Sequence, residues 1–173
     1  MKTRKMVISG LLIAIGVFLP IIFHSMSMGG QIFLPMHIPV LIAGILLGPL
    51  YGTLVGLITP MLSSFFTGMP PAFPMLPIMV FELGTYGLVS GYFSKLFPKK
   101  IFIPLLVAMV GGRITAGIVV FVLSRFFGAN IKPLFFLKGA IITGLPGIII
   151  QLIIIPPIIY ALRKNLRSLG QDL

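Results

Sequence analysis

Long apolar stretches separated by short polar or basic connections dominate this sequence. The apolar stretches cover residues 5–23, 37–48, 50–67, 76–97, 101–127 and 139–162. An α-helix needs about 20 apolar residues to cross the hydrocarbon core of a bilayer, and most of these stretches are close to that length. We therefore predict an all-α integral membrane protein, a bundle of about six transmembrane helices that forms one membrane domain over residues 1–173.

The second stretch, residues 37–48, is too short to cross a bilayer upright. We expect this segment to be tilted, partly sunken or re-entrant. Pro39 suits the first turn of a helix, and Gly48-Pro49 predicts a break before the next helix. Whether this segment crosses the membrane fully is left open by the pattern.

The composition agrees with a lipid environment. The chain has 173 residues, of which 58% are hydrophobic and 9% are charged, whereas soluble domains carry roughly 25% charged residues. The basic start, Lys2-Thr3-Arg4-Lys5, followed by an apolar run could imitate a signal peptide. Because no small-x-small cleavage site follows that run, we interpret it as a retained first span.

Most of the net charge of +11 is concentrated in short basic clusters. Nine of the 13 basic residues form three groups between apolar stretches: Lys2, Arg4 and Lys5; Lys95, Lys99 and Lys100; Arg163, Lys164 and Arg167. Six spans place all three groups on one side, and the positive-inside rule makes that side cytoplasmic, together with both termini. A nucleic-acid binder would instead interleave basic, polar and aromatic residues on one face.

Two charged residues fall inside the predicted spans. Glu82 lies about 10 Å from the outer end of its span, and Arg113 lies near the middle of the next one. Consecutive spans joined by a short loop are expected to pack antiparallel, so the two side chains can pair. A charge in the bilayer is costly and usually faces a partner or a cavity. Two interpretations stay open: a structural ion pair that locks two helices, or a pair that lines a polar ligand pocket.

Further polar residues at similar depth favour the pocket. Tyr86 lies one turn from Glu82 on the same helix face. Two more stripes occur at helical spacing: Thr143, Gly147 and Gln151 in the last span, and Thr59 and Ser63 in the third. Each residue alone could make an ordinary bond between helices, and only their convergence indicates a ligand site.

The predicted external connections have the composition of stiff caps. Residues 68–77 read GMPPAFPMLP and contain four prolines, which restrict the backbone. Rigid, aromatic and methionine-rich loops above a polar cavity are typical of a covered small-molecule site. For His37, at the end of the first external loop, the position at the membrane interface is favoured, and a ligand contact is the alternative that stays open.

The sequence lacks the residue sets that metal sites, nucleotide hydrolysis and nucleophilic catalysis require. It has no cysteine, two histidines and two acidic residues, so no metal site or cofactor is expected. It contains no G-x-x-x-x-G-K-[ST] phosphate loop and no nucleophile–base set. We predict that the chain is not an enzyme and does not hydrolyse nucleotide.

Two stretches resemble the substrate-binding S components of energy-coupling factor (ECF) vitamin transporters. They are FLPMHIPVLIAGILLGPLYGTLVGLITPMLSSFFTGMPP (33–71) and MLPIMVFELGTYGLVSGYF (75–93), and the length, six spans and missing nucleotide site extend the resemblance to the whole chain. It implies a multi-pass protein of the bacterial plasma membrane that binds a vitamin from outside. It also implies a scaffold subunit (the T component) and two cytoplasmic ATPase subunits as partners.

The resemblance also suggests a docking motif and a site. S components dock onto the scaffold through alanine-x-x-x-alanine on the first helix, and the matching positions here are Gly10 and Ala14, with glycine replacing the first alanine. The pocket of the family lies between the first external loop and the outer ends of spans four to six. Our candidate ligand contacts are Glu82, Tyr86, Arg113, Asn130, Lys138, Gln151 and His37.

The ligand itself stays open at this point. The basic residues Arg125, Lys132 and Lys138 near the outer mouth are compatible with a carboxylate or a phosphate, and the aromatic residues and Glu82 suit a nitrogen heterocycle. Pyrimidine or pyridoxine-like compounds, pantothenate and a cobalamin-precursor nucleoside are all candidates. The main alternative function is a stand-alone secondary transporter or channel for a small polar solute; a membrane enzyme or a purely structural protein are weaker alternatives.

Overall fold

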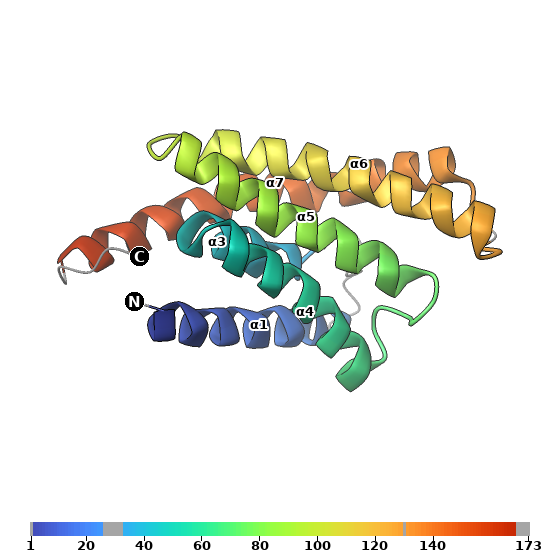
Figure 1. The fold of residues 1–173 in the computed structure, drawn as a ribbon, viewed down its shortest axis with the longest axis horizontal. Coiled ribbons are helices and arrows are strands. Elements are labelled where there is room, and N and C mark those ends of the chain that lie inside the picture. The colour runs from blue at the N-terminus through green and yellow to red at the C-terminus, as the bar shows by residue number, and fades with distance from the viewer. Residues whose placement is uncertain (1, 26–32, 130, 169–173) are drawn as a thin grey trace.

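The computed structural model describes residues 2–25, 33–129 and 131–168, and every regular element in these ranges is a helix (Figure 1). Their bounds are α1 Lys2–Ser25, α3 His37–Leu47, α4 Pro49–Thr67, α5 Met75–Leu96, α6 Phe102–Phe126 and α7 Pro133–Ser168. The predicted all-α fold is confirmed. The helix ends differ from the predicted spans by three residues or fewer except in α7, which extends six residues further at each end than the predicted 139–162.

Four of the described helices are long and apolar enough to cross a membrane: α1, α4, α6 and α7. The 22 residues of α5 would also reach across, but Glu82 and several hydroxyl-bearing residues make this helix more polar. It can tolerate them because it packs between α4 and α6, its two most extensive neighbours. Glu82, Tyr86, Ser90 and Ser94 of α5 are accordingly buried in protein, whereas Tyr92 is exposed.

The short helix α3 is the centre of the bundle. Nine of its 11 residues are buried, and it contacts each of the other five described helices. At 1.5 Å per residue it is about 16 Å long, roughly half the hydrocarbon thickness. Of the three arrangements left open for this segment, the structure supports a sunken one, in which α3 is enclosed by protein.

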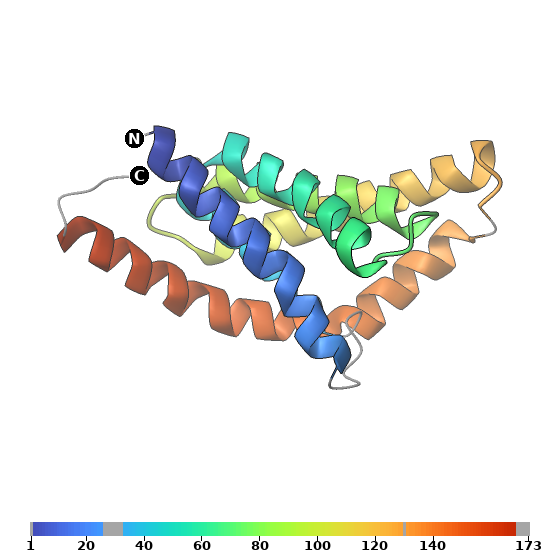
Figure 2. The ribbon, with the colours of Figure 1, turned by 90° about the horizontal axis from the view of Figure 1, so that it is seen from below.

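The other helices form an open ring around α3, in the order α1, α4, α5, α6 and α7. The first and last members, α1 and α7, do not pack against each other. Figure 2 shows that α7 changes direction along its length. Prolines lie inside α7 at 146, 156 and 157, and an interior proline removes a backbone hydrogen bond and bends a helix.

Glycines allow α3, α4 and α5 to approach closely. A Cβ added to Gly87 of α5 would overlap the backbone of Gly52 in α4, and one added to Gly56 of α4 would overlap the carbonyl of Leu83. A Cβ on Gly44 of α3 would lie 2.7 Å from the Gly87 carbonyl oxygen. These contacts are of the kind that small residues four apart predict in membrane helices.

The three basic clusters lie at one end of the bundle. Figure 1 shows the N-terminus and the C-terminus at the same end as the connection between α5 and α6. There, Arg163 of α7 donates to the Pro98 carbonyl oxygen at 2.6 Å and to Ser94 Oγ at 3.1 Å. Ser94 in turn donates to the Ile45 carbonyl oxygen of α3 at 3.0 Å. This end is the one that the positive-inside rule makes cytoplasmic.

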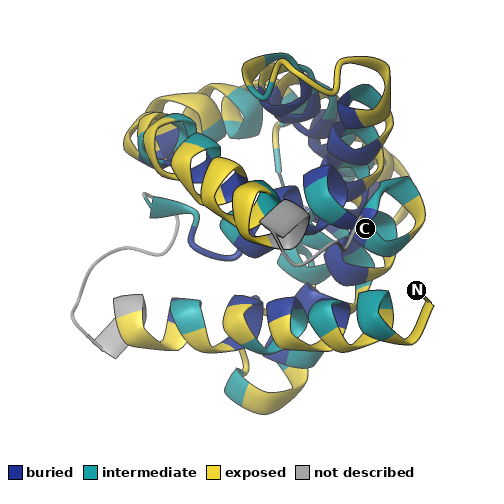
Figure 3. Ribbon diagram, turned by 90° about the vertical axis from the view of Figure 1, so that its left-hand side faces the viewer, coloured by how far each residue is buried: buried dark blue, intermediate teal, exposed yellow. Residues whose placement is uncertain are grey.

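The outer surface of the bundle is apolar. In Figure 3 the exposed residues lie on the outward faces of the helices and the buried residues face the interior. Large exposed side chains on these faces include Leu11, Phe65, Phe81, Val110 and Ile153. Such a surface is suited to lipid as its solvent.

Candidate ligand-binding site

A buried ion pair lies between α5 and α6. Arg113 Nη1 is 2.9 Å from Glu82 Oε1, and the two side chains are only 12% and 5% exposed. Glu82 is on the second turn of α5 and Arg113 is near the middle of α6, so antiparallel packing brings them to the same depth, as the sequence predicts. Buried charges are retained only when they are paired or serve a site.

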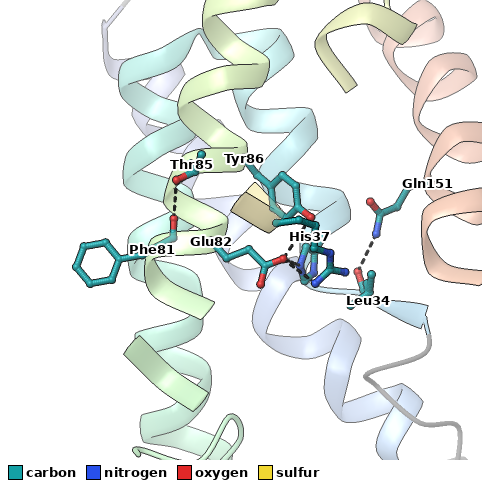
Figure 4. A network of polar contacts seen from close by, with 8 residues as sticks. Leu34, His37, Phe81, Glu82, Thr85, Tyr86 and Gln151 are labelled. Atoms are coloured by element: carbon teal, nitrogen blue, oxygen red, sulfur yellow. Dashed lines mark hydrogen bonds and ion pairs between the residues drawn. The ribbon is translucent and has the colours of Figure 1, made fainter. Parts of the chain in front are cut away.

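Tyr86 and His37 complete what we call the Glu82 cluster, which consists of Glu82, Arg113, Tyr86 and His37. The Tyr86 hydroxyl donates to Glu82 Oε1 at 3.3 Å, and His37 Nε2 lies 3.8 Å from the same oxygen. The rings of His37 and Tyr86 meet edge to face with centroids 5.0 Å apart. Figure 4 shows Glu82 and Tyr86 of α5 converging with His37 of α3.

His37 is deeply buried in this cluster, with 2% of its surface exposed. The expectation that His37 is an interfacial residue is therefore wrong. Its position follows from the depth of α3: the helix begins at His37 at the level of Glu82, rather than at the membrane surface. The His37 backbone N–H donates to the Leu34 carbonyl oxygen at 3.1 Å, which anchors this helix start.

Several nitrogen atoms of the Glu82 cluster have no hydrogen-bond partner among the described residues. They are Nδ1 and Nε2 of His37 and Nε and Nη2 of Arg113. Buried polar side-chain atoms are paired in the large majority of cases, and each exception calls for a reason. Arg113 and His37 therefore both have nitrogens without a hydrogen-bond partner among the described residues, although His37 Nε2 also lies 3.8 Å from Glu82 Oε1.

Gln151 of α7 faces the interior near this cluster. It is 1% exposed, and its Nε2 donates to the Leu34 carbonyl oxygen at 3.4 Å, as Figure 4 also shows. Leu34 has a positive φ of 49°, which is uncommon for a residue other than glycine. Gln151 thus holds the segment before α3 against α7, a positioning role that sequence reasoning did not assign to it.

The remaining candidates lie elsewhere. Lys138 is exposed on α7, and no hydrogen bond or ion pair joins it to the Glu82 cluster within the part of the chain that the structure describes. Asn130 lies outside the described residues. Thr143, predicted on the inward stripe of the last span, is exposed, and the buried face of α7 instead runs through Gly144, Gly147, Gln151, Ile155 and Ile159. Lys138 as a ligand contact stays a prediction.

The polar residues of the third span bond locally. Thr59 donates to the Val55 carbonyl oxygen at 2.6 Å in its own helix, and Ser63 donates to the Met69 carbonyl oxygen at 2.7 Å. Ser63 therefore fastens the external connection after α4 rather than contributing to the Glu82 cluster. This is the ordinary structural interpretation of those two residues.

Two site residues were missed by sequence reasoning. Leu34 supplies the carbonyl oxygen that Gln151 and His37 share, and Gly144 leaves room beside the guanidinium. A Cβ added to Gly144 would lie 3.1 Å from Arg113 Nη2 and 3.2 Å from Leu34 Cδ1. No local signal in the sequence distinguishes a glycine beside a guanidinium from one that only permits helix packing.

The sequence matches the family model described as ECF transporter, substrate-specific component, over residues 4–159. The chain belongs to this family. An ECF substrate-specific component is a transporter subunit rather than an enzyme, and the chain is a multi-pass membrane protein. No curated protein and no solved structure matches the chain. The resemblance to S components is thus confirmed by the family model, and the Glu82 cluster lies within the matched residues.

Proposed function

We propose that this S component binds a small water-soluble vitamin or vitamin precursor with high affinity at the Glu82 cluster. The supporting observation is the set of unpaired nitrogens on His37 and Arg113. Leaving a buried donor unpaired costs about 1–3 kcal/mol, and more for a charged group. A bound molecule with acceptor groups removes that cost, because it supplies the missing partners.

The position of α3 supports a site open toward the outer side. The helix begins at His37 and runs toward the basic, cytoplasmic end. No part of α3 therefore occupies the ring interior on the outer side of the Glu82 cluster. Residues 33–36 precede α3, and Pro35 and Met36 among them are buried, so a ligand arriving from outside would pass this segment before it meets Arg113, Tyr86 and His37.

Uptake requires partners that supply energy. We propose that the chain works in a bacterial plasma membrane with a T component scaffold and two cytoplasmic ATPase subunits, since it carries no phosphate loop of its own. The docking surface would include Gly10 and Ala14 of α1. Gly10 is exposed and a Cβ added there meets nothing within 4 Å, and Ala14 is partly exposed.

Reconstitution tests this function against a stand-alone transporter. We expect the purified chain to bind its vitamin in detergent or nanodiscs, and to accumulate it in liposomes only when the scaffold and ATPase subunits and ATP are present. Accumulation by the chain alone, driven by an ion gradient, would instead establish a secondary transporter. Absence of any bound small molecule in mass spectrometry and calorimetry would contradict the binding function.

Larger side chains at the docking surface should lower uptake without changing vitamin binding. We expect Gly10→Leu and Ala14→Leu to leave vitamin affinity within about twofold but to lower ATP-dependent uptake at least tenfold, because small residues permit close helix approach. Uptake by the reconstituted complex and co-purification with the scaffold measure the effect. The matched control is Gly139→Leu on α7, which also has open space around an added Cβ; equal loss in the control would refute the docking assignment.

A further inference from the structure

The geometry points to a ligand that carries a carboxylate. The carboxylate would bind the edge of the Arg113 guanidinium that is formed by Nε and Nη2, which we call the Arg113 edge. This inference rests on the proposed function and specifies its substrate class. Arg113 uses Nη1 for Glu82, and the atoms left unpaired are Nε and Nη2. A guanidinium has a rigid, planar set of donors that matches a carboxylate with two parallel hydrogen bonds. Within the described ranges, no acceptor pairs with this set of two adjacent donors.

Glu82 holds this edge in place. The ion pair fixes the guanidinium before a ligand arrives, and Gly144 adds no side chain beside Nη2, although the Leu34 side chain approaches the same point. A preorganised charged group loses little conformational entropy when it binds. The Glu82–Arg113 pair is thus a support for recognition, with Arg113 as the group that contacts the ligand.

The chemistry of the unpaired atoms favours an acceptor. All four buried side-chain atoms without a partner among the described residues are nitrogens, two from Arg113 and two from His37. A carboxylate offers only acceptors, with about four lone-pair sites. One carboxylate can therefore meet the Arg113 edge and leave an oxygen lone pair for a His37 N–H. A ligand with donors only would leave the two Arg113 nitrogens unpaired, because a guanidinium has no acceptor.

The charge of the outer end favours an anion. Arg125, Lys132 and Lys138 are exposed where α6 ends and α7 begins, and the two acidic residues of the whole chain are Glu82 and Asp172. The external connections therefore contain cations and no acid, and such a field raises the local concentration of anions. A phosphate fits less well, because its charge of about −1.5 to −2 would be buried beside a guanidinium that Glu82 already partly neutralises.

Matched probe pairs test the inference. Three carboxylates and their uncharged counterparts are titrated into the purified protein by calorimetry: nicotinate and nicotinamide, pantothenate and panthenol, biotin and biotin amide. Small molecules released from the purified protein are identified by mass spectrometry and titrated before and after amidation. We expect the carboxylate form to bind at least 30-fold more tightly than its uncharged form in every pair that binds.

The variants locate the effect at Arg113. We expect Arg113→Lys, which keeps the charge beside Glu82 but loses the paired donors, to weaken the carboxylate form at least tenfold and the uncharged form less than threefold. Arg125→Lys, the same change at an exposed position of the same helix, should alter neither. Thermal unfolding of each variant shows that the bundle is intact.

The outcomes separate the inference from the proposed function. Equal or tighter binding of the uncharged form, or a released molecule without a carboxylate, overturns the inference and leaves the S component with a different ligand. Equal weakening of both forms by Arg113→Lys also overturns it. If no molecule is released and no probe binds, the proposed function fails together with the inference.

Discussion

Replacing Glu82 with alanine is expected to lower the free energy of unfolding by about 3–5 kcal/mol, because it leaves the buried charge of Arg113 without a partner. Glu82 is 4% exposed and its carboxylate accepts from both Arg113 and Tyr86. Thermal and denaturant unfolding in a fixed detergent would measure the loss. A change below about 1 kcal/mol would contradict the ion pair as a buried interaction.

A double variant distinguishes the two interpretations of the pair. Glu82→Leu with Arg113→Met removes both charges and keeps similar volume, and such replacements are often neutral or stabilising. We expect this protein to fold with near-normal stability and to lose vitamin binding at least 100-fold. Normal stability with unchanged binding would show that the pair only locks α5 to α6. The comparison matters because the single variant alone cannot separate folding from recognition.

Replacing Gly87 with leucine is expected to lower the free energy of unfolding by more than about 3 kcal/mol, or to prevent folding. A Cβ at this position would overlap the Gly52 backbone, so the whole of α5 would have to move away from α4. Overpacking of this kind typically costs about 1–3 kcal/mol even where only side chains must yield, and here a backbone must yield. The yield of monodisperse protein and its melting temperature measure the effect.

Gly139→Leu on α7 is the matched control for this substitution. An added Cβ there meets nothing within 4 Å, and leucine has a higher helix propensity than glycine by up to about 1 kcal/mol. We expect the control to be neutral or slightly stabilising. Similar destabilisation at both positions would mean that loss of glycine itself, rather than the α4–α5 approach, causes the effect.

The bounds of most helices were predictable, because the thickness of the hydrocarbon core sets the length of an apolar helix that crosses it. Apolar runs mark the four helices that are apolar enough to cross a bilayer, and α5 as well, and the breaks at Gly48 and after Leu96 lie where glycine, proline and lysine interrupt the runs. The error in the last helix has a simple cause. Pro133 is accepted in a first helical turn, so α7 begins before the apolar run and continues through the basic cluster.

The candidate site was predictable in part. Glu82, Arg113 and Tyr86 could be brought together from sequence, because they lie on consecutive helices or on one helix face. His37 was misplaced, since its burial depends on how deeply α3 sinks into the bundle. The bond of Gln151 joins residues 117 positions apart in the chain, and no local pattern predicts such a contact.

The sequence by itself determined that this protein is embedded in a bilayer, which side of it is basic, and that two charges within the spans can pair. These follow from the cost of placing polar groups in hydrocarbon, and that cost depends on residue type and spacing alone. Only the tertiary structure decided that α3 is enclosed, that His37 joins Glu82 and that Arg113 keeps one edge unpaired. Those features depend on how helices distant in the chain pack at particular depths and rotations, where a glycine such as Gly87 allows contact and a single side chain would prevent it.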